Sequence, residues 1–279
     1  EKSLWFYRYY PGHYGSTIPS GRFIKENETE LFTSKVRLDG IDLNESRQFE
    51  LLQEFVSYYP EFTPSENKIS SQRYYYNNAM FGFNDGFVLS SFLRKFKPAK
   101  VIEIGSGFSS ALMLDTAESL SHATDFVFID PYTDNFENLQ LNVSQSNYKI
   151  IRNPIQDIDL DLFSELHEND ILFVDSSHVL KIGSDLSYIF FSILPSLQKG
   201  VIVHIHDIWW PYEYPLFMIN EGRIWNEIYF VRSFLQYNSA FEILCYNSFL
   251  EWKHKDYIKD SMPGYFKDTG KSLWLKKIG

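Results

Sequence analysis

The sequence predicts an α/β fold in which helices cover both faces of a doubly wound parallel sheet. From residue 100 onward, short apolar runs alternate with amphipathic stretches. The apolar runs are bounded by polar turn residues, which is the pattern of strands that are buried on both faces. The chain has 279 residues, 44% of them hydrophobic, and is therefore long enough to bury one large core with a smaller appendage.

The individual elements follow from these patterns. The apolar runs predict strands at residues 100–104, 125–129, 148–152, 170–174, 200–205, 241–245 and 272–275. The amphipathic stretches predict helices at residues 44–59, 85–96, 109–120, 135–143, 160–167, 182–197 and 223–237. Because strands and helices alternate after residue 100, this part predicts the doubly wound domain, and the irregular residues before it predict a cap of helices and loops.

The charge balance and the single cysteine limit the function classes. With 26 basic and 36 acidic residues the net charge is −10, and no long run of Lys or Arg is present, which disfavours a nucleic-acid partner. Cys245 is the only cysteine, so an internal disulfide is excluded and we expect a reducing, cytoplasmic location. No apolar run approaches the roughly 18 residues of a membrane span. The chain begins with Glu1 rather than Met, which leaves open whether residues precede it.

Ligands of open parallel sheets bind at the carboxyl ends of the strands, so the residues after each strand are the candidates for chemistry. Gly105, Ser106 and Gly107 follow the first strand and predict a tight turn that a ligand can approach closely. Loop geometry alone is the alternative, since the third glycine of a dinucleotide-binding fingerprint is absent. Glu103 precedes this turn. Its carboxylate would repel a pyrophosphate and suits a ligand with an amino group and a sulfonium.

The ends of the second and third strands carry further polar candidates. Asp130 lies about twenty residues beyond Gly107, the spacing of a carboxylate that accepts hydrogen bonds from ribose hydroxyls. A turn or helix-capping aspartate before Pro131 is the alternative. Gln156 and Asp157 follow the third strand and are candidates to meet an adenine amino group, with a plain surface loop as the alternative.

The ends of the fourth and fifth strands predict an acidic and histidine-bearing edge. Asp175, His206 and Asp207 are the candidate ligands of Mg²⁺ or another divalent cation, which would lower the pKa of a substrate hydroxyl. His178 has the ordinary pKa of a residue that accepts a proton near neutrality, and Asp175 would take this role if no metal binds. His204 is expected to be a histidine of the core or of a sheet face.

The loop at residues 208–222 follows the fifth strand and should overhang a substrate. It contains five aromatic residues, Trp209, Trp210, Tyr212, Tyr214 and Phe217. Their faces would suit sugar rings or another flat, partly apolar acceptor. The alternative is a contact within a homo-oligomer, and the sequence leaves the oligomeric state open.

Taken together, these residues resemble the class I S-adenosylmethionine-dependent methyltransferases. The resemblance rests on residues 101–107, 128–130, 170–175 and 200–207, and it covers roughly residues 75–279. Within this class the chain looks most like bacterial O-methyltransferases that act on small molecules or sugars. Residues 73–82 look like the segment that precedes the domain in such proteins. Asp175 and His178 are similar to the metal-and-base arrangement of macrolide-sugar O-methyltransferases.

The resemblance implies a Rossmann-like sheet of seven strands with an antiparallel last strand. It implies a cap over residues 1–84 that covers the substrate and cofactor, and an S-adenosylmethionine-binding domain over residues 85–279. The residues expected to bind the cofactor are Glu103, Gly105, Ser106, Gly107, Asp130, Gln156, Asp157 and Asp175. His178 and Asp175 are the candidate catalytic residues for methylation of a hydroxyl.

Three rival functions remain open from the sequence. An NAD-dependent oxidoreductase is disfavoured by the missing third glycine and by Glu103. A catalytically inactive, methyltransferase-like binding protein would keep the fold without the reaction. A metal-dependent hydroxylase or hydrolase would use the aspartates and histidines alone and leave the glycine turn and Asp130 without a role.

Overall fold

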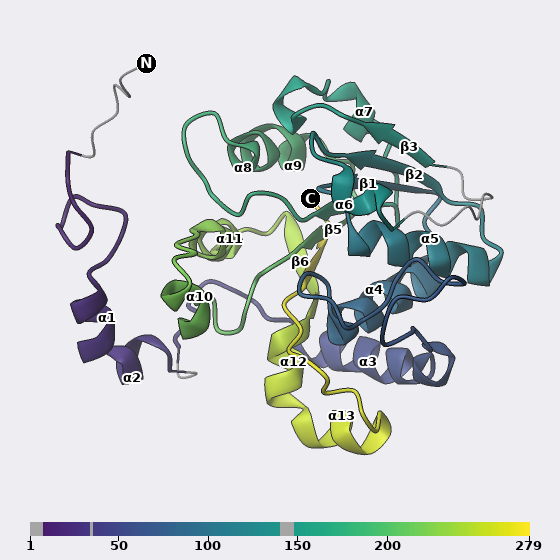
Figure 1. Cartoon of the computed structure of the whole chain (residues 1–279), viewed down its shortest axis with the longest axis horizontal. Coiled ribbons are helices and arrows are strands. Elements are labelled where there is room, and N and C mark those ends of the chain that lie inside the picture. Colours follow the sequence, from purple (N-terminus) through teal and green to yellow (C-terminus); the bar gives the residue numbers. More distant parts are fainter. Residues whose placement is uncertain (1–7, 34–35, 140–147) are drawn as a thin grey trace.

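The computed structural model describes residues 8–33, 36–139 and 148–279, and it shows one seven-stranded sheet with helices on both sides (Figure 1). The strands are β1 Lys100–Ile104, β2 Asp125–Ile129, β3 Tyr148–Ile151, β4 Ile171–Val174, β5 Ile202–Ile205, β6 Phe241–Tyr246 and β7 Leu273–Lys277. Their order is β3-β2-β1-β4-β5-β7-β6, and β7 runs antiparallel to both neighbours. The predicted α/β fold, with seven strands and an antiparallel last strand, is confirmed.

The register of the parallel strands builds a common edge. Ile104 of β1 pairs with Ile129 of β2 and with Val174 of β4, and Val174 pairs with Ile205 of β5. The four strands therefore end at the same level, and the residues that follow them meet along one edge of the sheet. Every residue of β4 and β5 is buried, as expected for central strands that are covered on both faces.

The helices form a layer on each side of the sheet (Figure 1). α4 (Phe83–Phe96) and α5 (Phe108–Leu120) pack against each other on one side. On the other side lie α8 (Asp185–Tyr188), the π-helical turn η3 (Ile189–Ile193) and α9 (Leu194–Ser196), which follow one another without a break, and α11 (Glu227–Leu235). Trp274 of β7 stacks on Phe92 of α4 with ring centroids 3.8 Å apart, which ties the first layer to the sheet.

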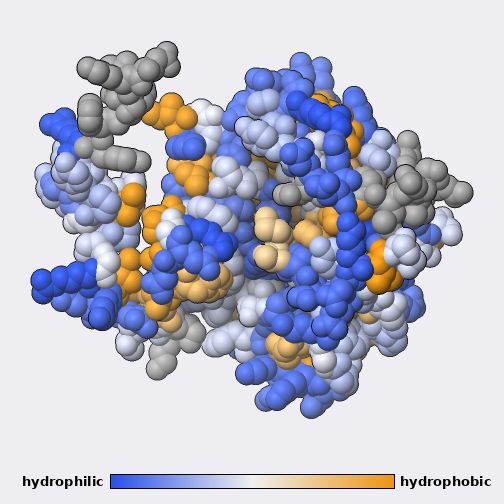
Figure 2. Space-filling model, in the orientation of Figure 1, coloured by the Kyte–Doolittle hydropathy of each residue, from blue (hydrophilic) through white to orange (hydrophobic). Residues whose placement is uncertain are grey.

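The N-terminal part divides into a projecting arm and a packed segment. α1 (Gly21–Glu26) and α2 (Glu28–Leu31) contain no buried residue and lie away from the sheet (Figure 1). α3 (Glu45–Val56) packs against β6 and is followed by the 3₁₀ turn η1 (Tyr59–Glu61). Figure 2 shows a largely hydrophilic face over the body, with hydrophobic side chains gathered toward the arm. Residues 1–7 and 34–35 of the predicted cap lie outside the described residues.

Residues 73–82 are fixed on α5. The buried Arg73 pairs with Asp115 and Glu118 at 2.8 Å each, and Asp115 also accepts the backbone N–H groups of Arg73 and Tyr74. Asn78 closes the turn that follows by accepting the N–H groups of Met80 and Phe81. This segment thereby reaches from the α5 layer to the carboxyl edge of the sheet.

Several helices differ from the prediction. The helix expected at 135–143 is α6, Asp134–Glu137, and residues 140–143 lie outside the described residues. The helix expected at 160–167 is only α7, Asp161–Ser164, and η2, Ile155–Asp157, precedes it. The helix expected to begin at Arg223 begins at Glu227, and Arg223 and Trp225 line a pocket instead.

Besides α1 and α2, the described residues form three further helices that were not predicted, namely α10 (Leu216–Asn220), α12 (Asn247–Lys253) and α13 (Lys255–Ser261). α12 follows β6 directly and packs against α4. Its buried residues are polar as well as apolar, so the sequence shows no clear amphipathic period. In the described part of the chain, none of the helices combines the length and the apolar character that crossing a membrane requires.

Candidate active site

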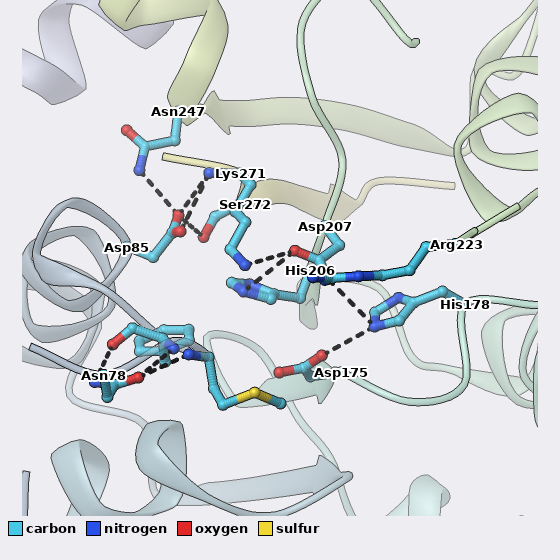
Figure 3. Close-up of polar contacts among 12 residues, drawn as sticks. Asn78, Asp85, Asp175, His178, His206, Asp207, Arg223, Asn247, Lys271 and Ser272 are labelled. Carbon is cyan, nitrogen blue, oxygen red and sulfur yellow. Dashed lines mark hydrogen bonds and ion pairs between the residues drawn. The ribbon is translucent and has the colours of Figure 1, made fainter. Parts of the chain in front are cut away.

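The candidate active site is a cavity of about 270 Å³ at the carboxyl edge of β1, β2, β4 and β5. Its wall combines the turn after β1 with the ends of the other three strands and with three segments from elsewhere in the chain. The lining residues from those three segments are Ala79, Met80 and Phe81, then Arg223 and Trp225, then Lys271. Figure 3 shows the polar residues that converge on it.

The glycine turn (Gly105, Ser106 and Gly107) connects β1 to α5. Gly105 has φ +88°, and a Cβ atom there would lie 1.7 Å from the carbonyl oxygen of Asp175. Only glycine fits this position, because both the backbone conformation and the contact with the end of β4 exclude a side chain. A Cβ atom on Gly107 would meet nothing within 4 Å, so this glycine faces open space. The turn thus exposes its backbone to the cavity.

Asp130 lines the same cavity and organises the glycine turn. Its Oδ2 atom accepts the backbone N–H of Ser106 at 2.8 Å and the Ser106 hydroxyl at 3.0 Å. Its Oδ1 atom accepts the N–H of Tyr132 at 2.7 Å. A carboxylate oxygen accepts two hydrogen bonds, so Oδ1 retains one acceptor position for a ligand.

Glu103 lies beneath the turn and does not line the cavity. Its carboxylate is fully buried and accepts the hydroxyl groups of Ser109, at 2.5 Å, and Ser110, both in the first turn of α5. Burial raises the pKa of Glu103 to about 8, although the two serines work against this shift. Glu103 therefore fixes the start of α5 and, through Ser110, the N–H of Gly107.

Gln156 and Asp157 are not brought to the cavity. Both are exposed in η2, and neither belongs to the lining. The Gln156 side-chain amide donates to the carbonyl of Gly183 at 2.8 Å. The reason is that η2 packs toward α8, on the outer side of the sheet.

The acidic rim (Asp175, His178 and Asp207) lies opposite the glycine turn. One potential ligand atom from each of these residues lies within 4.8 Å of the other two. His178 Nε2 is 3.4 Å from Asp175 Oδ1 and 3.5 Å from Asp207 Oδ2 (Figure 3). Of the metal ligands expected from the sequence, Asp175 and Asp207 belong to this group.

His206 does not belong to that group, and His178 takes its place. The His206 Nδ1 atom is 3.3 Å from His204 Nε2, and its ring lies 5.0 Å from that of Phe81. Its Nε2 atom is 3.8 Å from Asp207 Oδ1, the carboxylate oxygen that does not face His178. His204 is fully buried and stacks on Phe173, as expected for a core histidine. Side chains two residues apart along an extended segment point to the same face of a sheet. His204 and His206 therefore both turn their rings toward the face that α4 covers.

His178 is held from three sides by the start of α11. Its Nδ1 atom is 2.8 Å from Glu227 Oε2, and its ring stacks on Trp225 with centroids 4.3 Å apart. The N–H groups of Asn226 and Glu227 both donate to the His178 carbonyl at 3.3 Å. These contacts support a φ of +58°, which is unfavourable for a histidine and is tolerated only where the surroundings fix it.

The charges of the acidic rim shift its pKa values. Burial alone would lower the pKa of His178, but hydrogen bonds to Asp175 and Glu227 outweigh it and hold the pKa well above its usual range. Burial alone would raise the pKa of Asp175, but His206, His178 and Lys271 outweigh it and hold the pKa well below its usual range. The three carboxylates around His178 thus favour its charged form, which differs from the ordinary histidine expected from the sequence.

Lys271 reaches Asp207 from the segment before β7. Its Nζ atom is 2.9 Å from Asp207 Oδ1, so the two oxygens of Asp207 face different partners (Figure 3). Burial works against the charge of Lys271, but Asp207 and Asp85 outweigh it and raise its pKa. Asp207, like His178, has a positive φ, of +57°.

The aromatic residues of the loop at 208–222 do not line the cavity. Trp209, Tyr212 and Tyr214 are buried in the core. Trp210 packs on Tyr246, Phe249 and Trp252. Phe217 is exposed but lies outside the lining. The prediction that this loop offers aromatic faces to a substrate is wrong, because the loop turns its large side chains toward β6 and α12. Trp225, Phe108 and Phe81 supply the aromatic wall instead.

Sequence reasoning missed Glu227, Lys271 and Arg223 as site residues. Glu227 was visible only as part of a predicted helix, and Lys271 only as part of a short basic stretch. A buried glutamate at the first turn of a helix carries no local signal of the histidine that it meets almost fifty residues away. These residues join the site through the antiparallel return of the chain after β5, which no spacing rule reveals.

A family model and a sequence relative both match this chain. Residues 102–208 match a family model described as a methyltransferase domain. An uncharacterized protein of Archaeoglobus fulgidus is 34% identical over 171 residues, which are 58% of this chain and 75% of that protein. This identity and coverage place the two chains in one family.

Two solved structures have a similar fold at low sequence identity. The plantazolicin methyltransferase BpumL in complex with SAH is 15% identical, with a TM-score of 0.40, over 85% of this chain and 99% of its own. The SAH-bound Podospora anserina methyltransferase PaMTH1 is 14% identical, with a TM-score of 0.45, over 95% of this chain and 100% of its own. TM-scores this low carry no argument about acceptor or mechanism.

The matched domain contains the glycine turn, Asp130 and two residues of the acidic rim, Asp175 and His178. Asp207 also lies within it, whereas Glu227 and Lys271 follow it in the chain. The matched residues run from β1 to just beyond the end of β5. The chain therefore shares a family with the archaeal protein, and its matched domain makes it an S-adenosylmethionine-dependent methyltransferase.

Proposed function

We propose that this methyltransferase transfers the methyl group of S-adenosylmethionine to a hydroxyl group of a small molecule or sugar. The observation that carries the proposal is the pair of Glu227 and His178. Glu227 holds Nδ1 of the imidazole, and Nε2 faces Asp175 and Asp207 across the cavity from the glycine turn. A proton acceptor with a fixed orientation, opposite a cofactor turn, is the arrangement that O-methyl transfer requires.

The cofactor would lie on the glycine turn. Gly105, Ser106 and Gly107 offer backbone groups, and Asp130 offers the remaining acceptor position of Oδ1 to a ribose hydroxyl. Asp175, at the end of β4, is the acidic lining residue beside Gly105 and suits the cofactor's ammonium group. Glu103 would act indirectly, by fixing Ser109 and Ser110. Gln156 and Asp157 do not enter the proposal, because they lie outside the cavity.

In the proposed reaction the acceptor oxygen attacks the sulfonium methyl carbon in line. The new O–C bond forms as the C–S bond breaks, and the electron pair of that bond stays on the sulfur. The hydroxyl proton passes to His178 Nε2 in the deprotonated form of the ring, and Glu227 stabilises the imidazolium through Nδ1. Because the neighbouring carboxylates raise the pKa of His178, the fraction of the enzyme that carries this base grows with pH. Positioning contributes most to such a transfer, because the methyl group needs little covalent help.

A divalent cation bound by the acidic rim is a second candidate for activating the acceptor hydroxyl. Ligand atoms of one ion lie about 3 to 4 Å apart, and the distances of 3.4 and 3.5 Å from His178 Nε2 to the two carboxylates agree with this. Such an ion, Mg²⁺ or another, would lower the pKa of an acceptor hydroxyl. Because the same Nε2 atom would be the ligand, His178 is either the base or a ligand, and not both.

The acceptor class rests on the wall of the cavity. Trp225 offers an aromatic face, and Arg223 and Lys271 add hydrogen-bond donors, which suits a sugar or another compact polar acceptor. The acidic net charge of the chain supports the exclusion of nucleic acid. The cytoplasmic location and the oligomeric state stay predictions.

Calorimetry with S-adenosylhomocysteine and with NAD tests the cofactor. We expect the former to bind and NAD to give no heat, and the reverse result would contradict the proposal. Methyl transfer from labelled S-adenosylmethionine to a set of monosaccharides and phenols, with and without EDTA, then tests the acceptor class. Loss of transfer in EDTA would make His178 a ligand rather than the base.

The substitution His178→Ala tests the acidic rim. We expect turnover to fall by a factor of about 100 or more, with S-adenosylhomocysteine affinity kept within about threefold, because general-base catalysis contributes about that much. His167→Ala is the matched control, since His167 is exposed and far from the cavity. Unchanged turnover in His178→Ala would remove this residue from the mechanism.

A further inference from the structure

Lys271 is a charged residue of the site that takes no part in the proposed proton transfer. Its ammonium lines the cavity and pairs with Asp207 Oδ1 at 2.9 Å, and its side chain is 21% exposed. A lysine that served only solubility would extend into solvent. This one instead directs its charge into the acidic rim.

The backbone of Lys271 is fixed on both sides. Its N–H donates to the buried Asp85, at 2.9 and 3.2 Å to the two carboxylate oxygens, and its carbonyl accepts the N–H of Ile208, the residue after Asp207. Asp85 also accepts the Ser272 hydroxyl at 2.5 Å and the side-chain amide of Asn247 at 3.1 Å (Figure 3). These hydrogen bonds fix the backbone of Lys271 and so hold its ammonium group at Asp207.

The segment that carries Lys271, which we call the strap (residues 268–272), is attached at two further points. Asp268 accepts the N–H groups of Phe83 and Asn84 at the start of α4. Glu251 of α12 accepts the N–H of Gly270 at 3.0 and 3.1 Å. Two buried carboxylates, from α4 and α12, thus bind the strap and position a single cation at Asp207.

Carboxylates and cationic groups meet around His178. Asp175, Asp207 and Glu227 bring three carboxylates, and Lys271 and Arg223 bring two cationic groups to the same cavity. A divalent ion in the rim would take the place of the proton on His178 Nε2. Asp207 has one oxygen for each cation, since Oδ1 faces Lys271 and Oδ2 faces His178.

We infer that Lys271 is a built-in cation that shares Asp207 with the divalent ion and lowers the affinity of the acidic rim for it. This inference rests on the proposed cation site. The ammonium occupies Oδ1, so an ion can use only Oδ2, and it repels the ion across one carboxylate. The rim then binds a single ion weakly enough to exchange it, while Asp207 stays oriented when the ion is absent.

Titration of the full chain with Mn²⁺ by calorimetry tests this inference. We expect Lys271→Met to bind Mn²⁺ about tenfold more tightly or better, because a unit charge next to the ion is removed. Lys271→Arg keeps the charge and should bind within about threefold of the native chain. Lys276→Met is the matched control, because Lys276 lies on β7 but pairs with Glu168, away from the cavity.

The substitution Asp207→Asn separates the inference from the proposed cation site. If Asp207→Asn loses Mn²⁺ binding and Lys271→Met binds no more tightly than the native chain, the inference alone is overturned. If no variant binds Mn²⁺, or if Asp207→Asn binds it as well as the native chain, the cation site and the inference both fall. S-adenosylhomocysteine affinity reports folding in each variant, and Lys271→Gln replaces Lys271→Met if that protein does not fold.

Discussion

The glycine turn and the acidic rim face each other across one cavity but are built in different ways. The glycine turn, with Asp130, comes from two neighbouring strands and the first turn of α5, all within residues 103–132. The acidic rim draws its side chains from two strand ends, but its support comes from α11 and from the strap. One half is thus a local structure, and the other depends on distant parts of the chain.

This difference indicates which substitutions should affect each half of the site. The glycine turn is stabilised by hydrogen bonds between residues close in sequence, so it should tolerate changes elsewhere. The acidic rim holds two residues, His178 and Asp207, at positive φ, and their conformations depend on contacts that distant segments supply. Substitutions in the supports should therefore change the rim and leave cofactor binding intact.

The largest effect is expected from Gly105→Ala, which breaks both halves at once. The new Cβ would overlap the Asp175 carbonyl, and φ is +88°, so the ends of β1 and β4 must move apart. We expect a loss of about 3 to 5 kcal/mol in the free energy of unfolding and loss of S-adenosylhomocysteine binding. Chemical denaturation and calorimetry measure the two effects.

Gly107→Ala is the matched control for this substitution. A Cβ there meets nothing within 4 Å, so we expect the free energy of unfolding to change by less than about 1 kcal/mol. Equal destabilisation by the two substitutions would show that the turn does not depend on the approach to β4.

A smaller and pH-dependent effect is expected from Glu251→Gln in the support of the strap. Burial raises the pKa of Glu251 to about 8, with Asp85 and Asp268 adding to the shift and the Asn84 and Gly270 hydrogen bonds opposing it. In the unfolded chain a glutamate has a pKa of about 4.3, so between these values the folded state binds more protons. The stability contribution of this group is therefore complete at low pH and is lost as the pH rises to about 8.

Glutamine cannot ionise, so the free energy of unfolding of Glu251→Gln should rise relative to that of the native chain as the pH rises. We expect the difference in the free energy of unfolding to grow by about 1 to 3 kcal/mol between pH 5 and pH 8.5. Denaturation curves at several pH values measure it, with Glu168→Gln at an exposed position as the control. A difference that stays constant or shrinks with rising pH would contradict the assignment.

The smallest effect is expected from Asn226→Ala. Because this substitution touches only the acidic rim, it tests whether the rim and the glycine turn are independent. The Asn226 side chain accepts the N–H of Leu180 at 2.6 Å and donates to its carbonyl at 3.0 Å, which ties the loop after β4 to α11. We expect a loss of about 1 to 2 kcal/mol in stability. Methyl transfer should fall while S-adenosylhomocysteine affinity stays within about threefold.

If Asn226→Ala weakened cofactor binding as strongly as methyl transfer, the two halves of the site would not be independent.

The same division decides what the sequence could predict. The parallel strands were predictable because buried strands are continuous apolar runs, and the glycine turn because strand ends mark ligand sites. Asp175, His178 and Asp207 were predictable as neighbours because β4 and β5 are adjacent. The choice between His178 and His206 as the third group of the rim was not predictable, because it depends on how each ring packs. His206 also lines the cavity, but its Nδ1 atom faces His204 and its ring packs beside Phe81.

The supports of the rim were not predictable for a related reason. Glu227 begins α11, about twenty residues after β5 ends, and Lys271 reaches the site only after β6, α12 and α13. The aromatic residues of the loop at 208–222 looked like a substrate platform because aromatic faces suit sugars, but the same residues suit a core, and Tyr212 and Tyr214 lie there. Composition alone does not distinguish these two uses.

The position of Lys271 in the chain has a consequence for the protein during its synthesis. A ribosome that has delivered the residues up to Ile208 has already made the glycine turn, Asp130 and all three residues of the acidic rim. It has not yet made Glu227, which orients the imidazole, or the strap, which neutralises Asp207. The nascent chain therefore holds the means to bind a cofactor well before it holds a finished centre for using it.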